Sequence, residues 1–490
     1  MKKFGLYILI FVFLALPFVF YGCKNASAEN LSSYAMQLSY DEKTHILKGN
    51  ESVSYYNNST EMLSAVYFHL YPNVYKLDGK NKIVSQSHIE RAYPNGESEG
   101  NIEINYVKLQ SDDVQYVIEG EGENLLKINF PDGLYPGQNV QIEIDFIVTL
   151  ANINHRLGYG ENTINFGNFY PIVCVYENGS FRKDAYSSNG DPFYSEIANY
   201  DVQLTYSSDY KLATGGDIIS SENTQNLTIT RVKALKMRDY SFVLSKNFKI
   251  SSQRCGDVVV NYYGYVDDQN NGEALKTCID CLSFFNKTFG DYPYNQLSVV
   301  KSNFVYGGME YPGLVIISDE MLSREELNYV IIHEIAHQWW YGVVGSDQVH
   351  HAWQDEGLAE FSTLLFFKNC AEYGQNYNTM VNGALESYCL FERVYKNIEG
   401  ETKFSMDRAI YNFETEPEYT QCTYTKGLLM FDALMQDIGE KKLVKGLKKY
   451  YKDYAFKNAT PHDLIYCLSK GSGYDLEGYI KSWLDGKVVI

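Results

Sequence analysis

The pattern of polar and apolar residues changes near residue 252, and this change limits the possible folds more than any other feature of the sequence. Before it, short runs of alternating polar and apolar residues are separated by Gly, Pro, Asn and Asp, which is typical of β-strands joined by turns. After it, longer runs have the periodicity of amphipathic helices. The sequence therefore predicts an α+β multidomain protein, β-rich first and mainly helical afterwards.

The expected elements can be placed by residue number. Strands are expected at residues 52–56, 65–70, 115–119, 125–130, 140–150, 200–206, 227–231 and 240–244, and helices at residues 272–289, 324–341, 356–373, 424–438, 440–454 and 461–470. No repeat of about 20–50 residues is visible, so we expect a β-sandwich or a saddle of sheets rather than a propeller or solenoid. The predicted domains are residues 23–252 and 253–490, after a signal peptide at residues 1–22.

The charge of the chain excludes one class of partner. Among 490 residues, 61 are acidic and 42 are Lys or Arg, which gives a formal net charge of −19. Such a chain repels phosphate backbones, so we expect no nucleic-acid partner. Tyrosine is unusually common, with 44 residues, and its aromatic body and polar hydroxyl suit β-strands.

The N-terminus has the features of an export signal. Lys2 and Lys3 precede an uncharged apolar run at residues 4–21, which ends at Gly22 and Cys23. This junction resembles the lipobox of bacterial lipoproteins and predicts lipidation of Cys23 on the outer face of the cytoplasmic membrane of a bacterium. Two alternatives remain: cleavage after the A-x-A motif at residues 26–28, which would give a secreted protein, and an uncleaved anchor helix.

The cysteines give weaker information. Eight of the nine remain when Cys23 is set aside, an even number that permits disulfides in an exported chain without specifying any pairing. Cys278 and Cys281 could form half of a zinc ribbon, but the sequence has no second C-x-x-C pair. We therefore interpret them as neighbours on one helix.

One motif in the C-terminal part carries chemistry. His333-Glu334-Ile335-Ala336-His337 lies within the apolar run at residues 327–340. On a helix, two residues four positions apart share a face, so both imidazoles can bind one zinc ion, and the glutamate can take a proton from metal-bound water. With nine histidines in 490 residues, about 0.01 chance matches to this pattern are expected. The motif therefore predicts a catalytic zinc site with Glu334 as general base.

A catalytic zinc ion needs a third protein ligand and one open position. Glu356 lies 19 residues beyond His337, near the start of the next expected helix, and can supply that ligand. Asp347, Asp355 and Glu360 are nearby acids that compete with it. The residues alone leave this choice open.

The spacing H-E-x-x-H, eighteen residues, then Glu, with W-x-x-E-G-x-A around Glu356, resembles the gluzincin metallopeptidases of the aminopeptidase N family. The resemblance implies that one zinc ion per chain is bound by His333, His337 and Glu356. It also implies that the catalytic domain is thermolysin-like and that peptides are the substrates.

Two further segments carry the resemblance. Residues 306–312 are similar to the family's G-x-M-E-N loop, which implies that Glu310 binds the substrate amino group and that Gly307, Gly308 and Met309 belong to the substrate site. Tyr311 stands where the family has Asn. Residues 423–427 match the family's Y-x-K-G segment, which implies that the hydroxyl of Tyr424 stabilises the tetrahedral intermediate.

The leading hypothesis is an exported zinc aminopeptidase. The departure at Tyr311 keeps open a zinc endopeptidase of the same fold, and a non-catalytic surface binding protein is a third alternative, although it would not need Glu334. Glu360 could accept the second N–H of a zinc-binding histidine. We interpret His350 and His351 as structural or solvated, because adjacent residues point apart.

Overall fold

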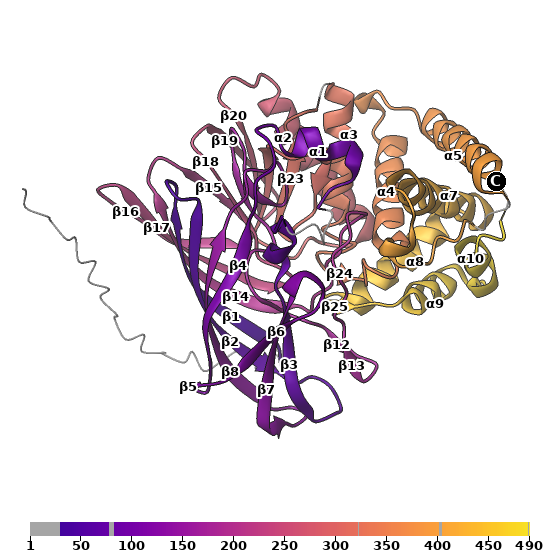
Figure 1. Cartoon of the computed structure of the whole chain (residues 1–490). Helices are drawn as coiled ribbons and strands as arrows, with labels where there is room; N and C mark the ends of the chain where they lie inside the picture. Colours follow the sequence, from indigo (N-terminus) through magenta and orange to yellow (C-terminus); the bar gives the residue numbers. More distant parts are fainter. Residues whose placement is uncertain (1–29, 78–82, 322, 401–403, 489) are drawn as a thin grey trace, which may run out of the picture. The chain divides into compact units, whose positions relative to one another are not determined.

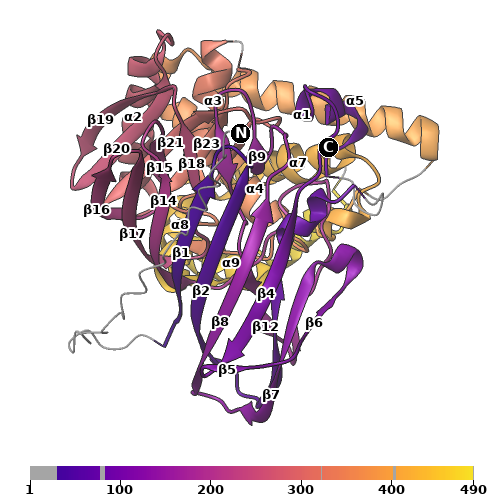
Figure 2. The ribbon, with the colours of Figure 1, turned by 60° about the vertical axis from the view of Figure 1, so that its left-hand side comes forward.

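An eight-stranded sheet forms the centre of the β-rich part (Figures 1 and 2). A computed structural model describes residues 30–77, 83–321, 323–400, 404–488 and 490. In sheet order the strands are β16 (Asp217–Thr224), β17 (Leu227–Met237), β14 (Ala198–Ser207), β1 (Ser32–Asp41), β2 (Ile46–Tyr56), β8 (Asn139–Thr149), β4 (Asn101–Leu109) and β5 (Asp112–Asp113). Strands β1 and β14 are parallel, and the other neighbours are antiparallel.

Burial along these strands follows the alternation of the sequence. In β14 and β8 nearly every second residue is buried, because successive side chains of a strand point to opposite faces. Two four-stranded sheets contribute to the same hydrophobic core. They are β15 (Lys211–Thr214), β18 (Phe242–Ser245), β10 (Ile164–Phe166) and β9 (Leu157–Tyr159), and β11 (Ile172–Val173), β3 (Leu63–His69), β7 (Leu125–Leu134) and β6 (Tyr116–Glu119).

A five-stranded sheet separates this core from a second one. Its order is β19 (Phe248–Cys255), β20 (Val258–Tyr265), β21 (Gln296–Ser302), β23 (Leu314–Ser318) and β22 (Gly308–Met309), with β20, β21 and β23 parallel. Tyr263 and Val300 join the core of the β-rich part, whereas Val260 and Val299 join the core of the helical part. Both faces are therefore buried, as is usual for parallel strands.

The remaining chain is mainly helical. The helices are α1 (Ile89–Ala92), α2 (Asn271–Phe289), α3 (Arg324–Ala336), α4 (Trp353–Asn369), α5 (Tyr377–Glu399), α6 (Glu416–Thr420), α7 (Lys426–Ile438), α8 (Glu440–Tyr454), α9 (Pro461–Ser472) and α10 (Glu477–Leu484), with a π-helix at Gln421–Thr425. Short 3₁₀ turns occupy Tyr71–Tyr75, Gln86–His88, Glu121–Glu123, Ala371–Tyr373 and Ile410–Asn412, and two strand pairs are β12 (Tyr176–Glu177) with β13 (Ser180–Phe181) and β24 (Val344–Gly345) with β25 (Lys457–Asn458).

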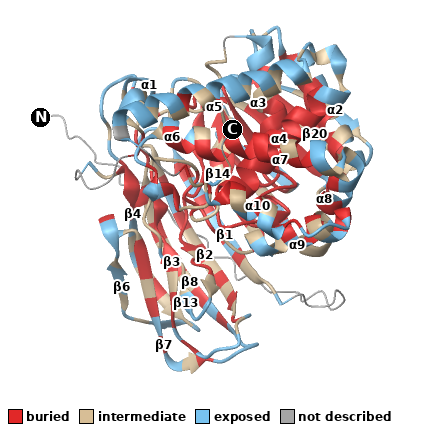
Figure 3. Cartoon of the chain, turned by 90° about the vertical axis from the view of Figure 1, so that its right-hand side faces the viewer, coloured by how far each residue is buried: buried red, intermediate tan, exposed pale blue. Residues whose placement is uncertain are grey.

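Two helices that carry predicted site residues are fixed by local chemistry. Helix α3 begins with a capping box, in which the Ser323 side chain and the Glu326 side chain each bond the other residue's backbone N–H. Helix α4 is buried from Trp353 to Phe367 and crosses α7 at two glycines (Figure 3). A Cβ on Gly427 would lie 2.8 Å from Gly357 Cα, so this close crossing depends on glycine.

The fold prediction is confirmed, since a β-rich part precedes a mainly helical part. Residue 252 falls inside β19, and residues Leu31–Ile490 form one compact unit, so the two-domain boundary stays a prediction. Helices α1, α5, α6 and α10 were not predicted. The signal peptide, Cys23 and the A-x-A motif lie outside the described residues.

The described residues give two further observations. All eight cysteines among them are free: Cys174, Cys255, Cys278, Cys281, Cys370, Cys389, Cys422 and Cys467. Cys278 and Cys281 lie on α2, as interpreted from the sequence. None of the helices in this part of the chain combines the length and the apolar character needed to cross a membrane.

Candidate active site

Three predicted metal ligands converge in the second core. His333 lies in the last turn of α3, His337 caps its C-terminus, and Glu356 lies in the first turn of α4. His337 Nε2 lies 3.1 Å from His333 Nε2 and 3.2 Å from Glu356 Oε2, and His333 Nε2 lies 3.3 Å from the same oxygen. The sequence spacing and the helix geometry thus bring two imidazoles and one carboxylate to one point.

This arrangement fits a zinc ion. Four ligands at 2.0–2.1 Å from a tetrahedral zinc lie about 3.3–3.4 Å apart, close to the three separations between these ligand atoms. All three residues are at most 7% exposed, and two nitrogens with one carboxylate oxygen form a typical donor set for catalytic zinc. Such a set leaves the fourth position for water or substrate.

The other nitrogens of both histidines face oxygen atoms that can orient the rings. His337 Nδ1 lies 3.1 Å from the Trp340 carbonyl oxygen, and His333 Nδ1 lies 3.0 Å from Glu360 Oε1. Glu360 also accepts a hydrogen bond from the hydroxyl of Tyr329. These oxygens favour protons on both Nδ1 atoms and leave both Nε2 atoms for the metal. The predicted role of Glu360 therefore agrees with its position.

Glu334 lies beside the metal ligands on α3. It is 6% exposed, and its Oε2 has no hydrogen-bond partner in the described part of the chain. The side chain packs over Gly308, where an added Cβ would lie 2.5 Å from Glu334 Oε1, so a larger residue at 308 would push the carboxyl away. Burial raises the pKa of Glu334 to about 8. A carboxyl with a free oxygen in this place can accept and return a proton.

Tyr424 reaches the same centre from the π-helix before α7. Its hydroxyl donates to Glu356 Oε1 at 2.5 Å, and its ring stacks on His333 at 6.0 Å between centroids. Short π-helical segments are frequent at functional sites. Tyr424 is thus close enough to the metal ligands for the predicted role, but its hydroxyl must leave Glu356 to donate to a substrate.

Glu310 follows the edge strand β22 and is 3% exposed. Its Oε1 accepts a hydrogen bond of 2.9 Å from Gln348 Nε2, and the same nitrogen donates to Asp355 Oδ2 at 2.7 Å. Burial and the negative charge of Asp191 raise the pKa of Glu310 to about 7. Glu310, His337 and Asp355 could also form a metal-binding trio, but the Gln348 amide occupies the space between the two acids.

Tyr311 points away from Glu310 and into the β-rich part. It is fully buried, and its hydroxyl donates to Asn168 Oδ1 at 2.9 Å. Asn168 Nδ2 donates in turn to Asp239 Oδ2 at 2.7 Å. Gly167 makes room for the ring, since a Cβ there would lie 1.9 Å from the Tyr311 hydroxyl. The phenol therefore does not narrow the space beside Glu310.

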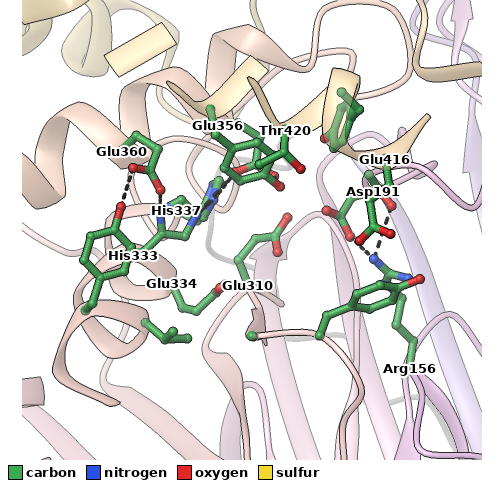
Figure 4. Close-up of a pocket in the computed structure, with 18 of the residues that line it drawn as sticks. Arg156, Asp191, Glu310, His333, Glu334, His337, Glu356, Glu360, Glu416 and Thr420 are labelled. Atoms are coloured by element: carbon green, nitrogen blue, oxygen red, sulfur yellow. Dashed lines mark hydrogen bonds and ion pairs between the residues drawn. The ribbon is translucent and has the colours of Figure 1, made fainter. Parts of the chain in front are cut away.

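A cavity of about 270 Å³ joins these groups (Figure 4). Its lining comprises Arg156, Ser188, Gly190, Asp191, Tyr306, Gly307, Gly308, Glu310, Tyr329, Val330, His333, Glu334, His337, Glu356, Glu360, Glu416, Tyr419, Thr420 and Tyr424. Gly307, Gly308 and Glu310 thus lie where the substrate-site prediction needs them. The Met309 side chain does not line the cavity: it is fully buried, and its sulfur lies 3.3 Å from Arg156 Nε.

Comparison with known proteins agrees with this geometry. A model of the peptidase family M1 domain matches residues 273–483. Those residues, the matched M1 domain, contain the metal ligands, Glu334, Glu310 and Tyr424. The resemblance to the aminopeptidase N family and the zinc cofactor are thereby confirmed.

The M1 domain has relatives among fungal and animal enzymes. The chain is 25% identical over 309 residues to aminopeptidase 2, mitochondrial, of Saccharomyces cerevisiae, which covers 60% of this chain and 30% of the relative. It is 23% identical over 379 residues to the puromycin-sensitive aminopeptidase of Caenorhabditis elegans, which covers 74% of this chain and 39% of the relative. The chain spans less than half the length of these curated relatives.

Solved structures share the fold over nearly the whole chain. The M1 zinc metallopeptidase of Deinococcus radiodurans superposes with a TM-score of 0.64 at 15% identity, covering 94% of both chains. This likeness includes the β-rich part as well as the M1 domain. It supports the predicted order of a β-rich part followed by a mainly helical one.

The other acids and histidines near the M1 site have different partners. Asp347 pairs with Arg182 and His350, and His351 Nδ1 lies 2.5 Å from Asp407 Oδ1. His350 and His351 are absent from both metal-binding trios found among the described residues, as interpreted from the sequence. Of the acids that competed to be the third ligand, only Glu356 lies within 3.3 Å of both His333 Nε2 and His337 Nε2.

Sequence reasoning missed one end of the cavity. Arg156 and Asp191 come from the β-rich part, and Glu416 and Tyr419 come from α6. Gln348, which holds Glu310, was also missed. These residues belong to no short motif, and the segments that carry them are far apart in the sequence, so no local signal could have identified them.

Proposed function

We propose that the chain is a zinc aminopeptidase that removes single residues from the free N-termini of peptides. The observation that carries this proposal is Glu310, a buried carboxyl that shares one cavity with the metal ligands. A free α-amino group is positively charged through most of the neutral range, and a fixed carboxylate attracts it. Because Glu310 would hold the amine at a set distance from the metal, only the first peptide bond would reach the reacting groups.

His333, His337 and Glu356 would hold the zinc ion, which supplies a water of lowered pKa and polarises the scissile carbonyl. Glu334 would take up a proton on its Oε2, which has no hydrogen-bond partner among the described residues, and would return it to the leaving amine. Gly308 leaves the room that this carboxyl needs. The proton therefore stays within the cavity during the reaction.

Tyr424 has the second role in the reaction. Its hydroxyl donates to Glu356 in the structure and can exchange this partner for the oxygen that becomes negatively charged. A preorganised donor of this kind contributes about 2–4 kcal/mol to transition-state stabilisation. The phenol ring of Tyr424 lies against the rings of His333 and Tyr419, so only its hydroxyl has to reorient to change partner.

The two alternative functions lose their support. The endopeptidase alternative rested on Tyr311, whose side chain lies in the β-rich core and not in the cavity. The binding-protein alternative would not require Glu334 beside three buried metal ligands. Neither alternative is favoured by a feature of the described site.

The test compares matched peptides with free and acetylated N-termini, with and without a zinc chelator, and identifies the products by mass spectrometry. Stepwise release of single residues from free peptides, with none from acetylated ones, is expected, and chelation should stop it. Glu334→Gln protein is the matched control for contaminating peptidases. Internal cuts in acetylated peptides would instead establish an endopeptidase.

For the location we propose an exported protein held at the outer face of the cytoplasmic membrane by lipid on Cys23. The support is the apolar run that ends at Gly22 and Cys23. Two acyl chains would hold the protein firmly, because each buried CH₂ contributes about 0.8 kcal/mol. Metabolic labelling with a fatty acid should mark the wild type but not Cys23→Ser. A soluble mature protein that begins at Glu29 would refute the anchor.

A further inference from the structure

The cavity continues beyond Glu310 to a far end, lined by Glu416, that the proposed reaction does not use. Arg156, Asp191 and Glu416 lie together on the side of Glu310 that faces away from His333 (Figure 4). The rings of Tyr306 and Tyr419 line the same cavity. If the substrate amine binds Glu310 and its carbonyl oxygen approaches the metal, this end is the remaining volume for the first side chain.

The cavity is strongly acidic. Six carboxyl groups line it, and Arg156 is its only guanidinium or ammonium group among the described lining residues; the acids are Asp191, Glu310, Glu334, Glu356, Glu360 and Glu416. By formal charge, the positive charges of Arg156, a divalent metal ion and one substrate amine do not balance the negative charges of these six carboxyl groups. A second positive charge on the substrate would reduce the remaining excess of negative charge.

Arg156 is already engaged by the protein. Its NH2 group donates to Asp191 Oδ1 at 2.5 Å and to the Gly190 carbonyl at 3.3 Å. Its guanidinium lies over the rings of Phe193 and Tyr306, at 5.5 and 5.3 Å from their centroids. The residue is 5% exposed, so it supports the wall of the cavity and offers little positive charge to a ligand.

Two hydroxyls at this end have no hydrogen-bond partner among the residues that the structure describes. The hydroxyl of Tyr419 is buried and unpaired in a residue that is only 3% exposed, and the hydroxyl of Tyr306 is likewise unpaired. Buried polar groups are usually hydrogen-bonded. A guanidinium or ammonium group brings only donors, which phenol oxygens and carboxylates accept, and it is also attracted to the faces of aromatic rings.

Glu416 is held in place by the β-rich part. Its Oε2 accepts from Ser85 Oγ at 2.6 Å, and its Oε1 lies 2.9 Å from His88 Nε2. A carboxylate offers about four acceptor positions, so further donors can still bind. Because these contacts fix the carboxylate before substrate arrives, little ordering is needed on binding.

We propose that the far end of the cavity is the subsite for the side chain of the first residue, and that it selects Arg or Lys through Glu416 and the Tyr419 hydroxyl. This inference rests on the proposed aminopeptidase function and adds its substrate class. Glu416 is a specificity residue in this scheme and takes no part in moving protons. It contacts the substrate without touching the scissile bond.

The test uses amidated tripeptides that differ only in the first residue, which is Arg, Lys, Leu or Glu. The wild type should cleave the Arg and Lys peptides with a kcat/KM about tenfold above that of the Leu peptide, the usual gain from one charge-assisted hydrogen bond. The Glu peptide should be the poorest. Glu416→Gln should bring the Arg to Leu ratio close to one, and Glu416→Lys should favour the Glu peptide.

Glu414→Gln is the matched control, since it removes the same charge from an exposed position two residues away. Its ratio should equal that of the wild type. Tyr419→Phe removes only the unpaired hydroxyl, keeps the ring, and should lower the Arg to Leu ratio a few-fold. Thermal unfolding of each variant checks that the fold is intact.

The outcomes separate this inference from the function on which it rests. Equal cleavage of Arg and Leu peptides by the wild type, or an equal loss for both peptides in Glu416→Gln, would overturn the basic subsite and leave the aminopeptidase function standing. Failure to release the first residue of any peptide would overturn the function and the subsite together.

Discussion

Glu334 in the M1 domain and Glu51 in the β-rich part are both buried carboxyls with oxygen atoms that have no hydrogen-bond partner among the described residues, yet their surroundings differ. Glu334 is 6% exposed, lines the cavity and lies beside the metal ligands, with one oxygen unpaired. Glu51 is fully buried on the core-facing side of β2, opposite Met36 and Ile144 on the neighbouring strands, with both oxygens unpaired.

The difference shows what an unpaired buried carboxyl can do in each setting. Glu334 faces a cavity in which water and substrate can exchange protons with it, so its raised pKa serves chemistry. Glu51 faces a closed core, and burial raises its pKa well above the ordinary value. It can only stay neutral there, so the same feature lowers stability.

The largest effect is expected when one of the metal ligands beside Glu334 is removed. His337→Ala should lose zinc and activity together, because one of three buried ligands disappears. Metal analysis of the purified variant, with peptide turnover, measures both losses. His462→Ala, which changes an exposed histidine of α9, should retain both. A variant at residue 337 that kept stoichiometric zinc and normal turnover would contradict the ligand assignment.

The next effect acts on the carboxyl itself. Glu334→Gln keeps the size of the side chain and all three ligands but cannot take up the proton. Turnover should fall by about 10²–10⁴-fold, the usual contribution of a general base, while zinc content stays unchanged. Near-normal turnover in Glu334→Gln would show that another group moves the proton. Glu334 would then be a buried carboxyl without a role in the reaction, as Glu51 is.

A smaller effect concerns Glu360, which orients one of the metal ligands. Glu360→Gln should weaken zinc binding by about 10–100-fold, because Glu360 faces His333 Nδ1 at 3.0 Å and orients that ring. Competition with a fluorescent chelator measures the affinity. Glu372→Gln, an exposed acid beyond α4, should bind zinc like the wild type. Equal affinity in both variants would show that Glu360 does not orient the ligand.

The metal end of the cavity was predictable because its information is local. Two histidines four residues apart must share a helical face, and this places His333 and His337 without any tertiary knowledge. The local pattern alone could not identify Glu356 as the third ligand, because Asp355 directly precedes it. Only the resemblance to a family favoured Glu356 over Asp355. The orientation of α4 against α3 decides this choice in space.

The far end of the cavity and the position of Tyr311 were not predictable. Arg156 and Glu416 meet only because segments of both parts fold against each other. Tyr311 could have narrowed the substrate site, and it turns away because Gly167 leaves room and Asn168 accepts its hydroxyl. Similarly, the five-stranded sheet buries both faces, which hides the alternation that marks exposed strands.

The smallest expected effect on activity, and the clearest on stability, concerns Glu51. Its folded-state pKa is raised, so below the unfolded value of about 4.3 both states are neutral and ionisation has no effect. Above it the unfolded state ionises while the folded state stays neutral, and stability falls by about 1.4 kcal/mol per pH unit until the folded-state pKa is reached.

The side chain of Glu51→Gln does not titrate. Between pH 5 and pH 7 the free energy of unfolding of this variant should therefore rise relative to that of the wild type, by up to about 2.7 kcal/mol. Peptide turnover should be unchanged, because Glu51 lies outside the cavity. Urea unfolding at both pH values measures the difference, and Glu103→Gln, an exposed acid on β4, is the control that should follow the wild type. If the wild type and Glu51→Gln lose stability in parallel as the pH rises, Glu51 is ionised or paired in the folded protein. The contrast with Glu334 would then rest on the cavity alone, and not on the missing hydrogen bonds.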